Sequence, residues 1–163
     1  MAALAALILI ALGVRYFIFE NIRMKTDAMS AAERSGGWAE SYAGDESYEK
    51  GKIVVINKLM DVSEIKRGSV VYANFTAIEN GKLLRRVAAV EGDEIITRED
   101  GNKYIVPGDG SKEINIGAAE GLAGGILQKD QYVLLCDDLS DPNALDSRQL
   151  GLVTSINFIG VPR

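Results

Sequence analysis

The chain opens with an apolar run that differs from everything after it. Every residue from Ala2 to Val14 is apolar or glycine, and Arg15 then separates this run from Tyr16–Phe19. About 13 residues of helix reach roughly 20 Å, which is short for a bilayer that needs about 20 residues. No basic residue precedes the run, and the aromatic residues after Arg15 are typical of a membrane interface rather than of a signal-peptide cleavage site. We therefore interpret residues 1–14 as a shortened single-pass membrane anchor, with a buried N-terminal core helix as the alternative.

The rest of the chain, residues 15–163, has the pattern of an all-β domain. Six short segments rich in β-branched or aromatic residues are bounded by turn residues such as Asn-Gly and Asp-Gly. These segments are Lys52–Asn57, Ser69–Phe75, Leu83–Val90, Glu94–Thr97, Lys103–Val106 and Gln131–Leu135. Short strands at near-regular spacing predict a domain of mainly antiparallel sheets.

Two stretches between these segments are predicted to be irregular. Residues 30–50 are polar and contain Trp38, which is either a partner contact or a local hydrophobic plug. Residues 117–125 contain four glycines. This second stretch lacks the Gly-Lys-Ser/Thr ending and the strand–loop–helix context of a phosphate-binding loop, so we interpret it as a flexible connector.

Composition narrows the chemistry that the domain can carry out. The sequence has no histidine and one cysteine, Cys136, which excludes histidine-based triads, histidine-ligated metals, Cys-x-x-Cys redox pairs and intrachain disulfides. The net charge is −5 and no basic patch appears, which argues against nucleic acid as a partner. Four acidic residues near the C-terminus lack the spacing of a calcium loop and are interpreted as a solvated acidic turn, so we expect no metal and no cofactor. They are Asp137, Asp138, Asp141 and Asp146.

Five sequence boxes, in the same order, resemble those of type I signal peptidases. Phe19–Met29 is similar to the family segment Phe-Glu-Pro-Phe-Arg-Val-Pro-Ser-Gly-Ser-Met, which leads out of the membrane. The other boxes are Gly51–Leu59, Ile65–Val71, Arg85–Asp93 and Ala144–Gly151, and Ile159-Gly160 matches the closing strand. The resemblance implies a membrane-anchored protein whose β domain lies on the extracytoplasmic side of the cell membrane.

The resemblance also locates the catalytic positions, and their residues depart from the family. In the family a serine attacks the peptide carbonyl, and a lysine made basic by an apolar pocket takes its proton. The serine position is Ala28, and the lysine position is Arg85, whose guanidinium stays protonated. The serine that orients the lysine falls at Ala144, and the oxyanion-hole serine falls at Thr26. We therefore expect lost peptidase activity and a peptide-binding cleft formed by Thr26, Asp27, Ala28, Met29 and Arg85.

The remaining matched residues are expected to be structural. They are Arg86, Gly92, Asp93, Asp146, Ser147 and Arg148. The spacing of Asp146 and Arg148 predicts that they share one face of a strand, and in the family such residues form ion pairs.

Three functions remain open from the sequence. Gram-positive members of the family that lack the Ser/Lys pair act as accessory factors in sortase-dependent pilus assembly, which implies pilin or sortase partners and is the leading hypothesis. The alternative is an active signal peptidase with a relocated dyad, either Ser30 with Lys82 or Thr26 with Lys25. The third is a non-catalytic membrane-tethered binding module for another envelope protein.

Overall fold

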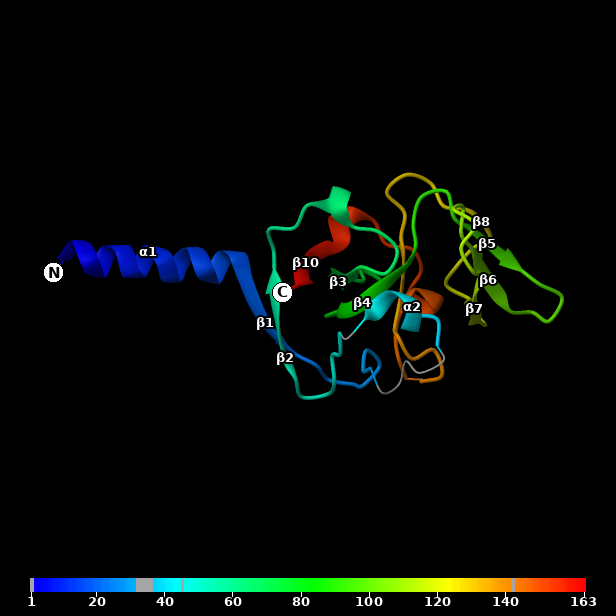
Figure 1. Cartoon of the computed structure of the whole chain (residues 1–163), viewed down its shortest axis with the longest axis horizontal. Coiled ribbons are helices and arrows are strands. Elements are labelled where there is room, and N and C mark those ends of the chain that lie inside the picture. The colour runs from blue at the N-terminus through cyan, green and yellow to red at the C-terminus, as the bar shows by residue number, and fades with distance from the viewer. Residues whose placement is uncertain (1, 32–36, 45, 142) are drawn as a thin grey trace.

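The computed structural model describes residues 2–31, 37–44, 46–141 and 143–163. In these residues the chain forms one long helix, ten strands and four short helical turns (Figure 1). The elements are α1 (Ala2–Ile18), β1 (Phe19–Arg23), α2 (Glu40–Ala43), β2 (Ile53–Asn57), η2 (Val62–Glu64), β3 (Val70–Asn74), β4 (Lys82–Ala89), β5 (Glu94–Thr97), β6 (Lys103–Val106), β7 (Ile114–Gly117), β8 (Gly125–Ile126), β9 (Val133–Leu135), α3 (Ser147–Leu150), η3 (Ser155–Asn157) and β10 (Phe158–Pro162).

The N-terminal helix extends away from the β domain and enters it through β1 (Figure 1). It has 17 residues and continues through Arg15 to Ile18, four residues beyond the predicted anchor. Apolar side chains on it are exposed, including Leu9 at 69% and Phe17 at 77%. No helix in the described part of the chain is both long and apolar enough to cross a membrane.

Two antiparallel sheets make up the domain, which confirms the prediction of a mainly antiparallel β fold. The larger sheet has the strand order β1-β2-β10-β3-β4-β9, and the smaller has the order β7-β6-β5-β8. Every strand pair is antiparallel. The smaller sheet lies at the end of the molecule opposite to α1 (Figure 1). Edge strands therefore include β1, next to the helix, and β7, at the far end.

Three clusters of buried apolar side chains form the core. The first lies around the chain segment that follows β1 and includes Met24, Met29, Ile56 and Leu84. The second joins the smaller sheet to β4 and β9, and Trp38 packs against it. The Nε1 atom of Trp38 also donates a hydrogen bond to the carbonyl of Cys136, 3.0 Å away. Trp38 thus attaches the polar segment to the core, as the local-plug alternative predicted.

Each of the six predicted segments contains a strand, and β5 and β6 match their predicted bounds. The pattern missed β1, β7, β8 and β10, although the family resemblance indicates a closing strand at Ile159-Gly160. β7 and β8 are too short for alternation to stand out. They lie at the two ends of the predicted connector 117–125, which therefore begins and ends in the smaller sheet. The polar stretch 30–50 was predicted to be irregular, but its described part contains the helical turn α2.

Candidate functional site

Ala28, the predicted position of the family nucleophile, lies inside the first core cluster. Ala28 has 2% of its surface exposed and shares this cluster with Met29 and Ala144, which are also buried. The carbonyl of Ala28 accepts hydrogen bonds from the backbone N–H groups of Asp137 and Asp138, at 2.9 and 3.1 Å. The chain at Ala28 is thus held against the segment that follows β9. Its methyl side chain offers neither a nucleophile nor a hydrogen-bond donor.

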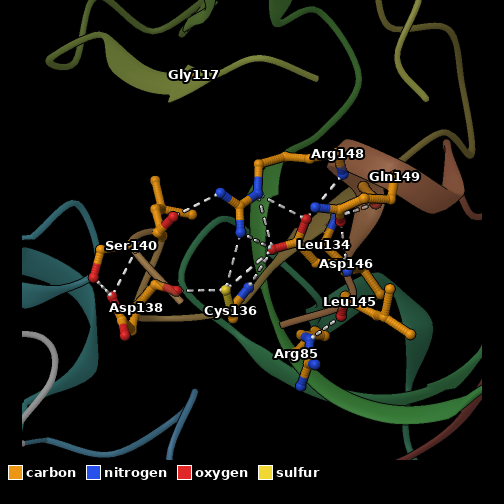
Figure 2. Close-up of polar contacts among 12 residues, drawn as sticks. Arg85, Gly117, Leu134, Cys136, Asp138, Ser140, Leu145, Asp146, Arg148 and Gln149 are labelled. Carbon is orange, nitrogen blue, oxygen red and sulfur yellow. Dashed lines mark hydrogen bonds and ion pairs between the residues drawn. The ribbon is translucent and has the colours of Figure 1, made fainter. Parts of the chain in front are cut away.

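The position of the family base, Arg85, is also buried and lies at the same segments. Arg85 is in β4 opposite Val71, with 5% of its surface exposed. Its Nε atom donates to the carbonyl of Leu145 at 2.8 Å, and Nη1 donates to the carbonyl of Leu84 at 2.6 Å (Figure 2). The first bond joins β4 to the residue after Ala144, so the three altered positions meet around one part of the structure.

The charge of Arg85 has an unusual environment. Among the described residues, no carboxylate oxygen lies within 4.0 Å of its guanidinium. Burial lowers the pKa of Arg85 from its ordinary value, and the carboxylates of Asp146 and Asp137 oppose this shift from a greater distance. An arginine starts from a pKa above 12 and stays charged at neutral pH, so Arg85 cannot accept a proton from a nucleophile. Within the described part of the chain, the hydrogen bonds of this buried cation go to backbone carbonyls.

The other predicted cleft residues, Thr26 and Asp27, lie on the surface. The carboxylate of Asp27 accepts a hydrogen bond from the backbone N–H of Lys50 at 2.8 Å. Met29, which follows Ala28, forms an isolated antiparallel bridge with Tyr48. The predicted cleft is therefore divided between two exposed residues and three buried ones, and its polypeptide is fixed by residues 48–50.

The structural residues near the C-terminus lie on a helical turn, and the prediction of a shared strand face was wrong. Asp146 is the N-cap of α3, and its side chain accepts hydrogen bonds from the backbone N–H of Arg148 and, through Nε, from the Arg148 guanidinium, at 2.9 and 3.0 Å. An N-cap carboxylate satisfies N–H groups that the helix itself leaves unpaired. Ser147 accepts a hydrogen bond from Leu134 N–H at 2.9 Å, which fixes the turn to β9.

Cys136 belongs to the same polar cluster (Figure 2). Its thiol is 3.1 Å from Oδ2 of Asp146 and 2.8 Å from the carbonyl of Asp138, and it is fully buried. Burial and the neighbouring Asp146 raise the pKa of the thiol. The sequence predicts a core residue at Cys136 but not its carboxylate partner, because residues 136 and 146 meet only in the folded chain.

Arg86, next to Arg85 in β4, forms a buried ion pair with Asp137. Two hydrogen bonds join them, from Nε at 2.8 Å and from Nη2 at 2.9 Å. Asp137 and Asp146 are 1% and 0% exposed, so for these two residues the prediction of a solvated acidic turn was wrong. Arginine provides their counter-charge. No group of three potential metal ligands occurs among the residues that the structure describes.

The turn between β4 and β5 is fixed in a similar way. Gly92 has a φ of +86°, a conformation that residues with a side chain rarely adopt. Asp93, which follows it, is buried and accepts hydrogen bonds from Val90 N–H, Gly108 N–H and the guanidinium of Arg67. Arg67 was not singled out from the sequence, although it lies in a matched box. Its pairing with Asp93 links the two sheets.

The profile described as "Signal peptidase, peptidase S26" matches residues 1–163. The chain belongs to the signal peptidase family. No match was found in a search of curated proteins. Family membership implies peptide or preprotein substrates, and signal peptidases are typically associated with membranes. For this signal peptidase family member, the assignment of Ala28 and Arg85 to the family's serine and lysine positions stays a prediction from the sequence resemblance.

The residues considered for a relocated dyad lie in different surroundings. Ser30 is buried with 3% of its surface exposed, whereas Lys82 is exposed at the first position of β4, opposite Asn74. A strand rises about 3.3 Å per residue, which places the backbone of Lys82 about 10 Å along β4 from Arg85. Lys25 is exposed beside Thr26. Both lysines are therefore exposed, whereas the lysine of the family's dyad lies in an apolar pocket.

Proposed function

We propose that this signal peptidase family member binds peptides without cleaving them and acts as an accessory factor in pilus assembly on Gram-positive cells. The observation that carries the proposal is the pair Ala28 and Arg85. A methyl group cannot attack a carbonyl, and a guanidinium cannot act as a general base. Both residues lie where β4, the segment around Ala28 and the segment around Ala144 meet. An active peptidase would therefore need both a nucleophile and a general base at another place in the fold.

Arg85 supports a binding role. Burying a cation is costly unless an anion pairs with it, and Arg85 has only backbone carbonyls as hydrogen-bond partners in the described residues. A carboxylate on a bound pilin or sortase segment would supply the missing counter-charge. The segment itself would add to the exposed edge beside Thr26 by strand pairing, a common mode of peptide recognition.

The N-terminal helix supports attachment to a membrane. It carries exposed apolar side chains at Leu7, Leu9, Ile10 and Val14, and Tyr16 and Phe17 follow Arg15 where it meets the domain. Arg163 also lies there, with its guanidinium 5.4 Å from the centre of the Phe19 ring. Aromatic residues and cations are typical of the membrane–water interface. In this proposal the β domain lies on the extracytoplasmic side, next to the membrane.

The decisive experiment compares Arg85→Met with Lys82→Met in cells from which the gene has been deleted. Both variants replace a cation of β4 with the same uncharged side chain, but only Arg85 is buried in the proposed site. We expect pilin polymers to be lost on deletion, restored by the wild type and by Lys82→Met, and not restored by Arg85→Met. Circular dichroism and thermal unfolding of both purified variants verify that they are folded.

Two results would contradict the proposal. Pilin polymerisation that is undisturbed by deletion would exclude the pilus role. Cleavage of a preprotein by the purified wild type, lost in Lys82→Met or Ser30→Ala, would instead establish the alternative of an active peptidase. If pilus assembly is unaffected but the chain captures another envelope protein through Arg85, the role is that of a general membrane-tethered binding module.

A further inference from the structure

A groove of about 740 Å³ lies between the smaller sheet and the polar segment that follows the nucleophile position. One wall is made by residues 112–115, where the chain enters β7, and the other by residues 37–42 and by the turn at residues 137–140. Residues 37–42 belong to the segment 30–50, which is about twice as long as a usual loop. This groove is distinct from the altered catalytic positions, since neither Ala28 nor Arg85 lines it.

The wall at β7 presents polypeptide backbone. Side chains of a strand alternate between two faces, so the lining of the groove by two consecutive β7 residues, Ile114 and Asn115, indicates that it runs along the edge of the strand. Lys112 and Glu113 line the groove just before the strand begins. Among the residues that the structure describes, β7 is an outer strand of its sheet and pairs only with β6. Two side chains of this wall have partners in the smaller sheet or next to it: Glu113, which precedes β7, pairs with Arg98, and Asn115 of β7 donates to the hydroxyl of Tyr104 at 3.0 Å. The free edge is therefore a template for another strand.

The opposite wall combines aromatic rings with acidic side chains. Trp38 and Tyr42 are in contact with each other, with ring centres 6.1 Å apart, and Trp38 packs against the core cluster that contains Ile114. Glu40 and Asp138 supply carboxylates on this wall. The carboxylate of Asp138 accepts hydrogen bonds from Ser140 and has no cation within 4.0 Å among the described residues (Figure 2).

We propose that this groove binds an extended polypeptide segment that carries lysine or arginine. The backbone of the segment pairs with the free edge of β7, and its basic side chains reach the carboxylates of Glu40 and Asp138. Strand pairing requires an extended peptide, and the acidic wall selects its charge. The proposal assigns a role to the long segment 30–50 and holds whether or not the Arg85 site binds a pilus component.

Trp38 is the only tryptophan of the chain, so its fluorescence reports on the groove. The full chain, in mild detergent, is titrated with an acetylated and amidated octapeptide that alternates lysine with valine and threonine. We expect saturable fluorescence change at low salt and weaker binding at high salt, because exposed charges are screened. The same peptide with glutamate for lysine, and versions N-methylated at every second amide, serve as probes of charge and of backbone pairing.

Two double variants are compared. The first pair of substitutions, Glu40→Gln with Asp138→Asn, tests the groove, and the second pair, Glu99→Gln with Glu120→Gln, is the control. Each pair removes two exposed or half-exposed carboxylates, but only the first pair lines the groove. Asparagine also retains an acceptor for Ser140. We expect the first pair to weaken binding about fivefold to tenfold and the second pair to leave it unchanged.

Equal binding of the glutamate peptide, unchanged affinity in the first pair of variants, or no binding at millimolar concentration would each overturn the proposal. So would equally strong binding of N-methylated peptides in both registers. A chain that is dimeric by light scattering, and that the peptide converts to monomers, would identify a second copy as the natural occupant. That result would also overturn the proposal.

Discussion

Arg86 and Asp137 form a two-point ion pair in which the side chains are 1% and 0% exposed. Asp137 also lies where the backbone meets Ala28, because its N–H donates to the carbonyl of that residue. One carboxylate thus joins β4, the segment after β9 and the former nucleophile position. The ion pair therefore holds together the segments around Ala28.

Replacement of Asp137 by asparagine should strongly destabilise the fold. It keeps the shape of the side chain but leaves the Arg86 cation buried without its counter-charge, and broken buried pairs typically cost about 3–5 kcal/mol. Denaturant unfolding of the purified variant measures this loss. Glu46→Gln is the control: Glu46 is 3.6 Å from Arg86 but 56% exposed, so we expect a change below about 1 kcal/mol. Similar losses of unfolding free energy in the two variants would contradict the conclusion that Asp137 is the main counter-charge of Arg86.

Restoring the family dyad should not restore cleavage. Ala28 is 2% exposed among packed apolar residues, and reaction requires the attacking atom to approach the carbonyl to about 3–3.5 Å. We therefore expect Ala28→Ser combined with Arg85→Lys to remain inactive on a preprotein, as measured by gel shift of the cleaved product. The single variants serve as controls. Cleavage that appears only in the double variant would mean that a substrate reaches this position.

The thiol of Cys136 should be inert while the protein is folded. It is fully buried, and burial together with Asp146 raises its pKa, so little reactive thiolate forms at pH 8. We expect no measurable reaction with a disulfide reagent in native buffer and the release of one equivalent in denaturant. A rapid native reaction would show that the segment around residue 136 opens. Asp146→Asn should increase the reaction rate, because it removes the negative charge beside the sulfur.

Stability at alkaline pH should depend on Tyr48. Burial, with a contribution from Glu46, raises its pKa to about 12, whereas a tyrosine in the unfolded chain ionises near 10. The folded state therefore holds this proton more tightly, and its contribution to stability is complete below about pH 10 and is lost as the pH rises toward 12. We expect Tyr48→Phe to flatten the decline of the unfolding free energy across this range. The free energies of the two proteins are first matched at pH 7. If Tyr48→Phe then shows the same decline of the unfolding free energy with pH as the wild type, the attribution of that decline to Tyr48 is wrong.

The sequence by itself determined the family and most of the strands. Alternating or continuous β-branched residues between turn residues are local signals, so segments such as Glu94–Thr97 and Lys103–Val106 could be located without any tertiary information. The identities of Ala28 and Arg85 are likewise facts of sequence, because the absence of a hydroxyl and of a free base does not depend on the fold. The N-terminal apolar run predicted a helix for the same reason, and α1 confirms it.

Only the tertiary structure decided where the charges go. A carboxylate after a strand looks the same in sequence whether water or an arginine faces it, so Asp137 and Asp146 were interpreted as solvated although both are buried in ion pairs. The sequence also could not place Arg85 against the carbonyl of Leu145, or residues 37–42 opposite β7. These contacts join residues far apart in the chain, and their partners are selected by packing of the two sheets rather than by any local pattern.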